Sequence, residues 1–304
     1  MSGARDWRLV VGSGAAACGA PEAADGATNM AIDQALLDAV ADGAPPVVRL
    51  YRWSPATLSF GRNQPTRGLY DEAAAAGRGI AFVRRPTGGQ AVLHDRELTY
   101  AVVAPVAVIG KPRAAYRRIN EALVAGLGRL GLEAAVAGGF GQSVPPGAMP
   151  GARPGSAPSW MEACFRRPER GEVVVGGKKL VGSAQRTESR TILQHGSILM
   201  GGSQSPVEEL LRTPAVVAEP AGTAPGGDLR EGRGQGGGGE QGWTTLAREL
   251  GRRPGLAALW KAVVAGFEEV LGTGLAPSLL RPPESGAARE LRSRFGSDAW
   301  TWRR

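Results

Sequence analysis

Residues 82–95 read Phe82-Val83-Arg84-Arg85-Pro86-Thr87-Gly88-Gly89-Gln90-Ala91-Val92-Leu93-His94-Asp95. This pattern predicts a strand that delivers two arginines into a Gly-Gly turn, and a second strand that ends in His94-Asp95. Glycine lets backbone N–H groups approach a ligand closely, and a guanidinium offers planar donors to a phosphate or carboxyl oxygen. An ordinary hairpin with solvated arginines would share the Gly-Gly turn, and a lone histidine such as His94 more often makes a structural hydrogen bond. The combined spacing of arginines, glycines and His-Asp is much rarer, so this stretch is a candidate binding site.

A second hairpin is predicted where Glu172-Val173-Val174-Val175 is followed by a Gly176-Gly177 turn and by Lys179-Leu180-Val181. The chain continues into Gly182-Ser183-Ala184-Gln185, whose small residues leave room for a ligand beside Lys179. The pattern G-x-x-x-x-G-K-[ST] of a nucleotide-binding phosphate loop is absent here. The alternative is a lysine on the rim of a hairpin, and the neighbouring Lys178 fits that description.

Cys164 lies fifteen residues before Lys179, separated from it by one predicted strand and a tight turn. A hairpin of that length can bring a thiol and an ammonium group together. A free thiol titrates near ~8.5, and an adjacent cation lowers that value and supplies thiolate at neutral pH. The alternative for any free cysteine is a small buried core residue, and Cys18 fits this better.

The strand predicted over 191–200 carries Gln194 and the second histidine, His195. Either side chain could face the same cavity as Lys179. A structural hydrogen bond is an equally good interpretation of both.

The remaining elements predict an α+β fold with a mixed β-sheet core flanked by helices, because strands and helices mix without strict β-α-β alternation. Asn29 is the expected N-cap of a helix over 30–40, and a further helix is expected over 256–271. We expect residues 1–43 to form a strand, loop and helix packed on the core, and residues 256–304 to form a C-terminal helical segment. Between them, we expect residues 44–255 to form the main domain, with Gly/Pro-rich insertions at 138–159 and 221–242.

The composition of the 304-residue chain narrows the function classes. Two histidines and two cysteines, without C-x-x-C or H-x-x-x-H spacing, argue against a structural zinc site. So few cysteines also argue against a disulfide framework and favour a cytoplasmic location. The net charge of +8 predicts acidic partners, among them nucleic acid, an anionic membrane or an acidic protein. No apolar run reaches the roughly 18 residues of a membrane span, and no RNA-binding aromatic motif is present.

Seven segments of the chain together match one known set of motifs. They are Asn29-Met30-Ala31-Ile32-Asp33, residues 49–61, residues 84–95 with Glu97-Leu98-Thr99-Tyr100, Ala163-Cys164-Phe165, residues 179–185, residues 194–199 and residues 295–302. Taken in order, they resemble the lipoate–protein ligase/biotin ligase superfamily, most closely its LipM-type octanoyltransferases. The resemblance covers nearly the whole chain apart from the two insertions and the extreme N-terminus, and it implies the catalytic-domain fold of that superfamily.

The resemblance also implies an activity and a site. Such transferases take an octanoyl group from octanoyl-acyl carrier protein and attach it to a lysine of a lipoyl domain, typically the glycine cleavage H protein. By position, Cys164 would be the nucleophile and Lys179 the residue that lowers its pKa. No nucleotide, other cofactor or metal is implied, and the basic charge would then serve acidic carrier proteins and neither nucleic acid nor a membrane. The implied substrate-binding residues are Arg84, Arg85, Gly88, Gly89, Gln90, His94, Gly182, Ser183, Ala184, Gln194 and His195.

Three other functions compete with this interpretation. An ATP-dependent lipoate–protein ligase shares the fold, but its motif usually has a third glycine where this chain has Gln90, and it needs no cysteine at position 164. An amidotransferase that moves octanoyl between lipoyl domains would also use a cysteine. A non-catalytic binding protein could use the arginine excess for RNA or carrier docking.

Overall fold

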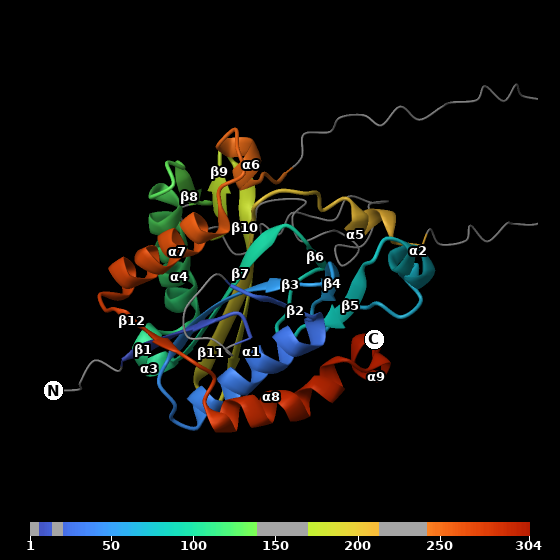
Figure 1. Cartoon of the computed structure of the whole chain (residues 1–304), viewed down its shortest axis with the longest axis horizontal. Helices are drawn as coiled ribbons and strands as arrows, with labels where there is room; N and C mark the ends of the chain where they lie inside the picture. The colour runs from blue at the N-terminus through green and yellow to red at the C-terminus, as the bar shows by residue number, and fades with distance from the viewer. Residues whose placement is uncertain (1–5, 14–20, 139–169, 213–241) are drawn as a thin grey trace, which may run out of the picture.

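A mixed β-sheet forms the centre of the fold, with strands in the order β12-β1-β3-β7-β11-β10-β9-β8 (Figure 1). The computed structural model describes residues 6–13, 21–138, 170–212 and 242–304. The central strands β3, β7, β11 and β10 pair antiparallel, whereas β1 pairs parallel with both β3 and β12. The predicted α+β class with a mixed sheet is therefore confirmed. The strands are β1 (Trp7–Val11), β2 (Ala23–Ala24), β3 (Val47–Trp53), β7 (Glu97–Pro105), β8 (Ala134–Val136), β9 (Val173–Val175), β10 (Lys178–Glu188), β11 (Thr191–Leu199) and β12 (Leu275–Ser278).

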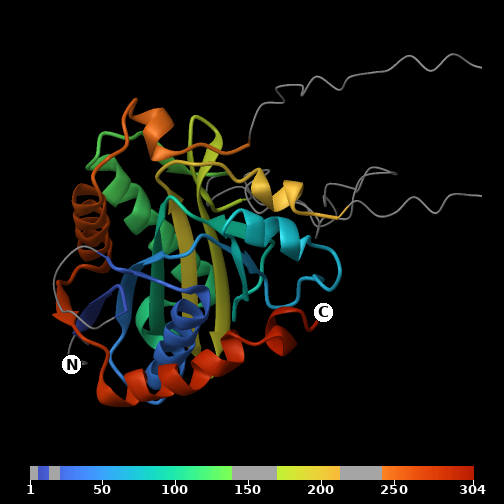
Figure 2. The ribbon, with the colours of Figure 1, turned by 45° about the vertical axis from the view of Figure 1, so that its right-hand side comes forward.

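Helices cover both faces of this sheet, as the two ribbon views show (Figures 1 and 2). Helices α1 and α8 lie side by side on one face, and α4 and α7 cover the other. Strand β7 shows why both faces are covered, since Leu98, Tyr100 and Val102 point to α4 and α7 while Ala101 and Val103 point to α1. The helices are α1 (Gly26–Ala41), α2 (Glu72–Gly77), α3 (Val106–Ile109), α4 (Pro112–Gly128), α5 (Pro206–Glu209), α6 (Leu246–Glu249), α7 (Leu256–Leu271), α8 (Pro282–Phe295) and α9 (Asp298–Thr301).

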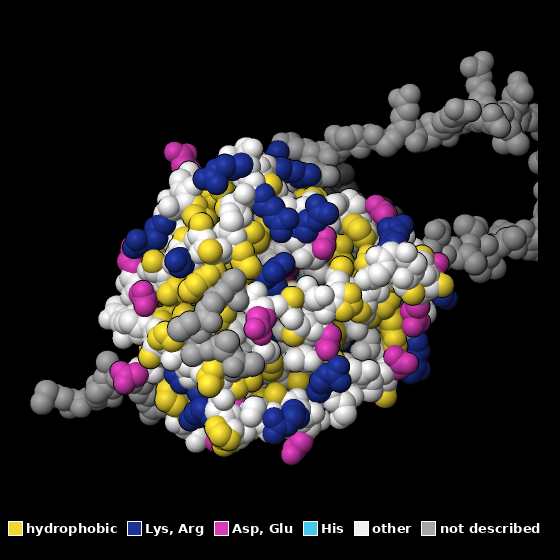
Figure 3. Space-filling model, viewed as in Figure 1, with side chains coloured by type: hydrophobic (Ala, Val, Ile, Leu, Met, Phe, Trp, Pro, Cys, Tyr) yellow, Lys and Arg dark blue, Asp and Glu magenta, His cyan; other side chains and the backbone are white. Residues whose placement is uncertain are grey.

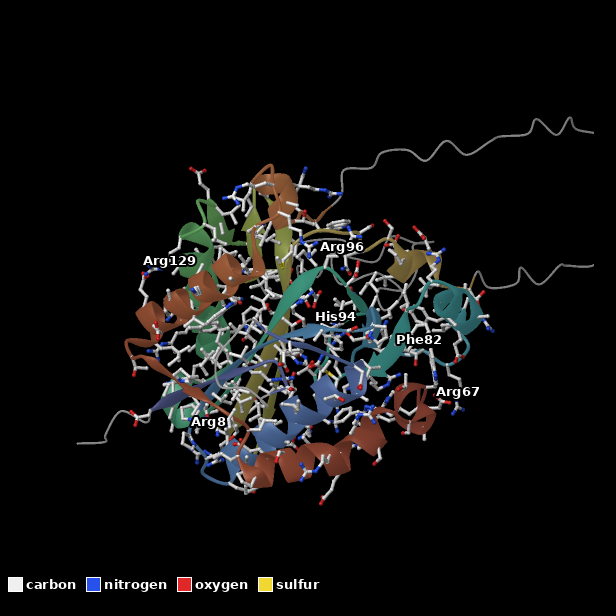
Figure 4. The ribbon with its side chains drawn as sticks, in the orientation of Figure 1. Arg8, Arg67, Phe82, His94, Arg96 and Arg129 are labelled. Atoms are coloured by element: carbon white, nitrogen blue, oxygen red, sulfur yellow. The ribbon has the colours of Figure 1, made fainter. Side chains whose placement is uncertain are left out.

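A small second sheet contains both strands expected around the Gly-Gly turn. It has the order β5-β4-β6, formed by β4 (Thr57–Phe60), β5 (Ala81–Arg84) and β6 (Val92–His94). Because β4 lies between β5 and β6, these two strands do not pair with each other and do not form an ordinary hairpin. Phe82 packs against Phe60 and Trp302 at ring-centroid distances of 5.6 and 5.0 Å, and Figure 4 shows it on the side of the molecule away from Arg8 and Arg129. This aromatic contact attaches the end of the chain to the small sheet.

The element boundaries follow local signals where those exist. The helix expected over 256–271 is found as α7, and it ends at Gly272, whose φ of 69° suits a C-terminal cap. Asn29 is the wrong N-cap, because α1 begins at Gly26, four residues before the expected start, and the Asp25 carboxylate accepts the N–H of Thr28 at 2.8 Å. The insertions expected at 138–159 and 221–242 lie outside the described residues, apart from Gly138 and Gly242.

Candidate functional site

A pocket lies between the main sheet and the small sheet, on the face that α1 covers. Its walls are formed by side chains and backbone of α1, β3, β6, β7, β10 and β11 and of the turn between β5 and β6. Seven of the substrate-binding residues expected from the sequence lie in these walls. The complete lining is Met30, Tyr51, Trp53, Arg85, Gly89, Val92, His94, Thr99, Gly182, Ser183, Ala184, His195, Gly196 and Ser197.

Arg85 holds the Gly-Gly turn in place. Its Nη1 donates to the Ser59 carbonyl and hydroxyl oxygens at 2.8 and 2.6 Å, and its Nη2 donates to the Gly88 and Gln90 carbonyl oxygens at 3.0 and 2.9 Å. The turn also needs a glycine beneath it, since a Cβ on Gly61 would lie 1.8 Å from the Gly89 carbonyl oxygen. Gly88 and Gln90 thus shape the turn through their carbonyl groups, whereas Gly89 lines the pocket.

Arg84 points away from the pocket although it neighbours Arg85. Its Nη1 donates to the Gly61 carbonyl oxygen at 2.7 Å, and its Nε donates to the Thr301 carbonyl oxygen at 3.0 Å. Burial, together with the charges of nearby arginines, lowers the pKa of Arg84 to about 10. Arg84 therefore binds the C-terminal segment to the small sheet, because adjacent residues of a strand project to opposite sides.

His94 lies in the interior of the fold (Figure 4) and joins a hydroxyl to a carboxylate. Its Nδ1 is 2.7 Å from Glu97 Oε1, and its Nε2 is 2.6 Å from Ser59 Oγ. In the tautomer with its proton on Nδ1, the imidazole donates to Glu97 and its Nε2 accepts from the Ser59 hydroxyl. The indole of Trp53 stacks on the imidazole at a centroid distance of 4.0 Å. We call Ser59, His94 and Glu97 the His94 relay.

His195 makes a second arrangement of the same kind, the His195 relay, with Thr87 and Asp33. Its Nδ1 is 2.9 Å from Asp33 Oδ2, and its Nε2 is 2.6 Å from Thr87 Oγ1. Burial lowers the pKa of His195, although hydrogen bonding to Asp33 opposes the shift, so the ring is neutral at pH 7. Burial acts to raise the pKa of Asp33, but Arg49, His195 and Tyr51 outweigh it and hold that pKa below its ordinary value.

Gln194 lies on the other face of β11 from His195. Its Nε2 donates to the Tyr100 hydroxyl oxygen at 3.0 Å, and Tyr100 is 2.7 Å from Ser183 Oγ. The two strands approach closely here, since a Cβ on Gly196 would lie 2.5 Å from the Gly182 carbonyl oxygen. Gln194 therefore supports the sheet from the side of α4, and His195 is the member of the pair that faces the pocket.

Lys179 is fully buried at the start of β10, and its Nζ lies 2.5 Å from Glu172 Oε1. The turn between β9 and β10 needs its two glycines, because Gly176 and Gly177 have φ angles of 54° and 76°. A bulge between Lys179 and Val181 changes the alternation of side chains along β10. Cys164 lies outside the described residues.

Sequence reasoning missed the partners of the expected site residues. Ser59, Glu97, Asp33 and Glu172 each contact one of them, at separations of 3 to 162 positions along the chain. Glu172 carried a usable signal, because a carboxylate stands just before a strand whose hairpin partner begins with lysines. Among the described residues, no group of three or more His, Cys, Asp or Glu side chains could hold a metal ion. No helix in the described part of the chain has the length and apolarity needed to span a membrane.

Comparison with known proteins places the chain in a family. Residues 25–268 match the model of the lipoyl protein ligase A/B catalytic domain. An octanoyltransferase LipM of Kyrpidia tusciae is 39% identical, with 98% of this chain and 99% of that protein covered. An octanoyltransferase LipM of Moorella thermoacetica is 35% identical, with 91% and 94% covered.

Solved structures agree on the fold. A lipoate-protein ligase A bound with ATP aligns with a TM-score of 0.70 at 20% identity, covering 98% of both chains. The bi-partite lipoate protein ligase of Thermoplasma acidophilum aligns with a TM-score of 0.68 at 20% identity, covering 98% of this chain and 96% of that one. The chain belongs to the lipoyl protein ligase A/B catalytic domain family, together with the LipM octanoyltransferases.

Proposed function

We propose that this chain, an octanoyltransferase of lipoate biosynthesis, takes its octanoyl group from octanoyl-acyl carrier protein and carries it as a thioester on Cys164. The acceptor is a lysine of a lipoyl domain such as that of the glycine cleavage H protein, and the reaction takes place in the cytoplasm. The observation that carries this proposal is the full-length similarity to the LipM octanoyltransferases, at 39% identity for the protein of Kyrpidia tusciae. A lipoyl domain also appears as the partner of the bi-partite ligase from Thermoplasma acidophilum.

The pocket has the chemistry expected for an acyl chain. Met30, Trp53 and Val92 present apolar surface, and Gly182 and Ala184 leave space beside β11. Each methylene removed from water stabilises binding by about 0.8 kcal/mol, so an octanoyl chain gains several kcal/mol by entering. Both imidazoles that line the pocket already have hydrogen-bond partners on their two nitrogens, so an acyl chain can lie against them without leaving these nitrogens unpaired.

Lys179 supports the thioester route. Its ammonium group is buried beside Glu172 at the start of β10, the strand whose residues 182–184 line the pocket, and it can donate to a thiolate and, later, to an oxyanion. Thiolate attack on an acyl thioester exchanges one thioester for another, and amide formation then makes the second half downhill. Cys164 is fifteen residues from Lys179 along the chain, which is short enough for the two groups to meet.

The surface near Lys179 suits acidic carrier proteins. Figure 3 shows Lys and Arg side chains gathered at the end of the molecule that holds α6 and the β9–β10 hairpin. Lys178 precedes Lys179, Arg248 of α6 lies over the ring of Trp243 at 4.6 Å, and Trp243 forms a β-bridge with Lys179. Arg96, which Figure 4 places at the same end, has 61% of its side chain exposed. These cations would attract an acidic donor or acceptor.

The test uses purified protein, octanoyl-acyl carrier protein and apo H protein without ATP. We expect octanoyl transfer to the H protein and an added octanoyl mass on Cys164 when the acceptor is omitted. Cys164→Ala should abolish both while leaving the circular dichroism spectrum unchanged. Strict dependence on ATP, or full activity of Cys164→Ala, would contradict the proposal in favour of a ligase. Transfer only from an octanoylated lipoyl domain would instead identify an amidotransferase.

A further inference from the structure

The proposed reaction releases one proton per turnover, and this proton has to leave the site before Cys164 is again a thiolate and Lys179 again an ammonium ion. At neutral pH the acceptor lysine is an ammonium ion, so octanoyl transfer converts a thioester and R–NH3+ into an amide, a free thiol and one H+. This inference rests on the proposed function, because it follows the protons through the two half-reactions.

In the first half-reaction the Cys164 thiolate forms a C–S bond to the octanoyl carbonyl carbon, and the donor's C–S bond breaks with its electron pair on the donor sulfur. That sulfur takes a proton from the Lys179 ammonium, which leaves Lys179 as a neutral amine. In the second half-reaction Lys179 takes one proton from the acceptor ammonium. The acceptor nitrogen then forms the C–N bond, and Cys164 leaves as a thiolate. The new amide nitrogen still carries a second proton, and Lys179 is by then an ammonium ion that cannot take it.

A carboxylate lies in direct contact with the Lys179 ammonium group in the structure. Glu172 Oε1 lies 2.5 Å from Lys179 Nζ, and the two side chains are only 5% and 1% exposed. Desolvation penalises both charges of such a buried pair, which lowers the cost of moving a proton from the ammonium to the carboxylate. A proton can therefore pass from the Lys179 ammonium to Glu172 and leave Lys179 free to accept again.

Among the residues that the structure describes, the other titratable groups near this pair are poor acceptors. Burial raises the pKa of Tyr100 on β7, and the charge of Glu172 contributes in the same direction, so this hydroxyl stays protonated. The imidazoles of His94 and His195 each have both nitrogens engaged in their relays. Lys178, Arg170 and Arg248, which flank the pair along the chain or lie over Trp243, are cations and cannot take a proton.

We infer that Glu172 accepts the last proton of amide formation through Lys179 and then releases it to solvent. The cycle closes with Cys164 as thiolate, Lys179 as ammonium and Glu172 as carboxylate, and one proton has entered the solvent. Because Glu172 contacts Lys179 and does not line the pocket, it is a positioning residue that acts through that lysine.

The experiment measures the two half-reactions separately in Glu172→Gln, in rapid-mixing assays with octanoyl-acyl carrier protein and apo H protein. Loading of Cys164 should change by less than about threefold, because it needs only the Lys179 ammonium. Transfer from the loaded enzyme should fall by about 10²-fold, the usual contribution of a positioned acid or base. The variant's transfer rate should also rise about tenfold per pH unit, because hydroxide replaces the missing base.

Two controls separate a proton role from a structural one. Glu249→Gln removes a carboxylate that accepts from Thr244 at the same end of the sheet, and both of its half-reactions should match the parent protein. Glu172→Asp keeps a carboxylate and should recover much of the transfer rate and the parent pH profile.

Three results would overturn the inference. Transfer by Glu172→Gln at the parent rate and pH profile would exclude Glu172 as the acceptor. An equal loss in both half-reactions would mean that Glu172 only holds Lys179 in place. Absence of the Cys164 thioester in the parent protein would overturn the proposed function and this inference together, whereas the first two results leave the proposed function intact.

Discussion

The two histidine relays face one pocket and share one design, yet their charges are balanced differently. In the His195 relay, the Arg49 guanidinium lies 2.7 Å from Asp33, and both side chains are fully buried. In the His94 relay, Glu97 Oε1 accepts from His94, Thr99 and Ser197, while Glu97 Oε2 has no hydrogen-bond partner. No cation of the described residues pairs with Glu97 in the way that Arg49 pairs with Asp33.

Because of this difference, the pocket wall formed by the His195 relay is held by more interactions than the wall formed by the His94 relay. Arg49 also donates to the carbonyl oxygens of Gly12 and Asn29, so the His195 relay joins the start of the chain, α1 and β3 in one network. Removing any member leaves a buried charge or a buried donor unpaired. The His94 relay joins β4, β6 and β7 through hydrogen bonds alone, with half of its carboxylate unused.

The sharpest way to break the comparison is to remove one charge from each relay. Arg49→Met should lower the free energy of unfolding by about 3–5 kcal/mol, because it leaves Asp33 as an uncompensated buried charge. Glu97→Gln should cost less, about 1–3 kcal/mol, because Oε1 keeps its three donors and no charge is left unpaired, although the new amide N–H groups stand where Oε2 had no partner. Urea unfolding of both variants measures the difference.

An exposed ion pair provides the control for these two variants. Arg78 and Glu209 lie 2.6 Å apart with about half of each side chain exposed, so Arg78→Met should cost less than about 1 kcal/mol. If Arg49→Met and Glu97→Gln lower the free energy of unfolding equally, the two relays contribute equally to stability and the Arg49 ion pair does not distinguish them.

The turn between β5 and β6 connects the relays, and disturbing it should affect both at once. Gly61→Ala places a methyl group 1.8 Å from the Gly89 carbonyl oxygen, where backbone has to move. We expect a loss of about 1–3 kcal/mol in stability and a larger proportional loss of octanoyl transfer, since Arg85 and Thr87 both sit on this turn. Gly77→Ala, where a methyl group meets nothing within 4 Å, is the matched control. Normal transfer by Gly61→Ala would show that the position of the turn does not matter.

How far the sequence predicts this arrangement depends on how local each signal is. Helix α7 was predicted to the residue because its apolar spacing and Gly272 lie within the segment itself. The start of α1 was missed, because the side chain of Asn29 accepts from Arg49 of β3 and so serves a distant strand. Local helix propensity contains no information about a hydrogen bond to a residue that is distant in sequence.

The same reasoning applies to the candidate site. The fold and the pocket lining around Arg85, Gly182 and His195 followed from motifs. The sequence does not predict to which face of the sheet Gln194 points, because every residue of β11 is buried and the strand has no alternation of polar and apolar residues. Strand alternation alone would have predicted that only one of Arg84 and Arg85 faces the pocket, since neighbours in a strand project to opposite sides.

The pH dependence of stability offers the smallest and most specific test of the comparison. Burial lowers the pKa of His195, so just below the ordinary histidine value of about 6.5 the unfolded chain binds a proton that the folded protein does not. This contribution is complete above that pH and is lost as the pH falls through the window beneath it, at up to about 1.4 kcal/mol per pH unit. The lowered pKa of Asp33 acts in the same direction only at much lower pH, below its ordinary 3.8.

Urea unfolding between about pH 7 and pH 5 should therefore show a free energy of unfolding that falls as the pH is lowered in the parent protein. The profile of His195→Gln should be flatter. The amide of glutamine can still bridge Thr87 and Asp33, but it does not titrate in this range. His94→Gln removes the other histidine of the pocket and leaves the His195 relay in place, so the part of the slope that His195 causes should remain. A slope that disappears in His94→Gln and persists in His195→Gln would reverse the assignment, and the relay without a cation would then be the one that couples folding to protons.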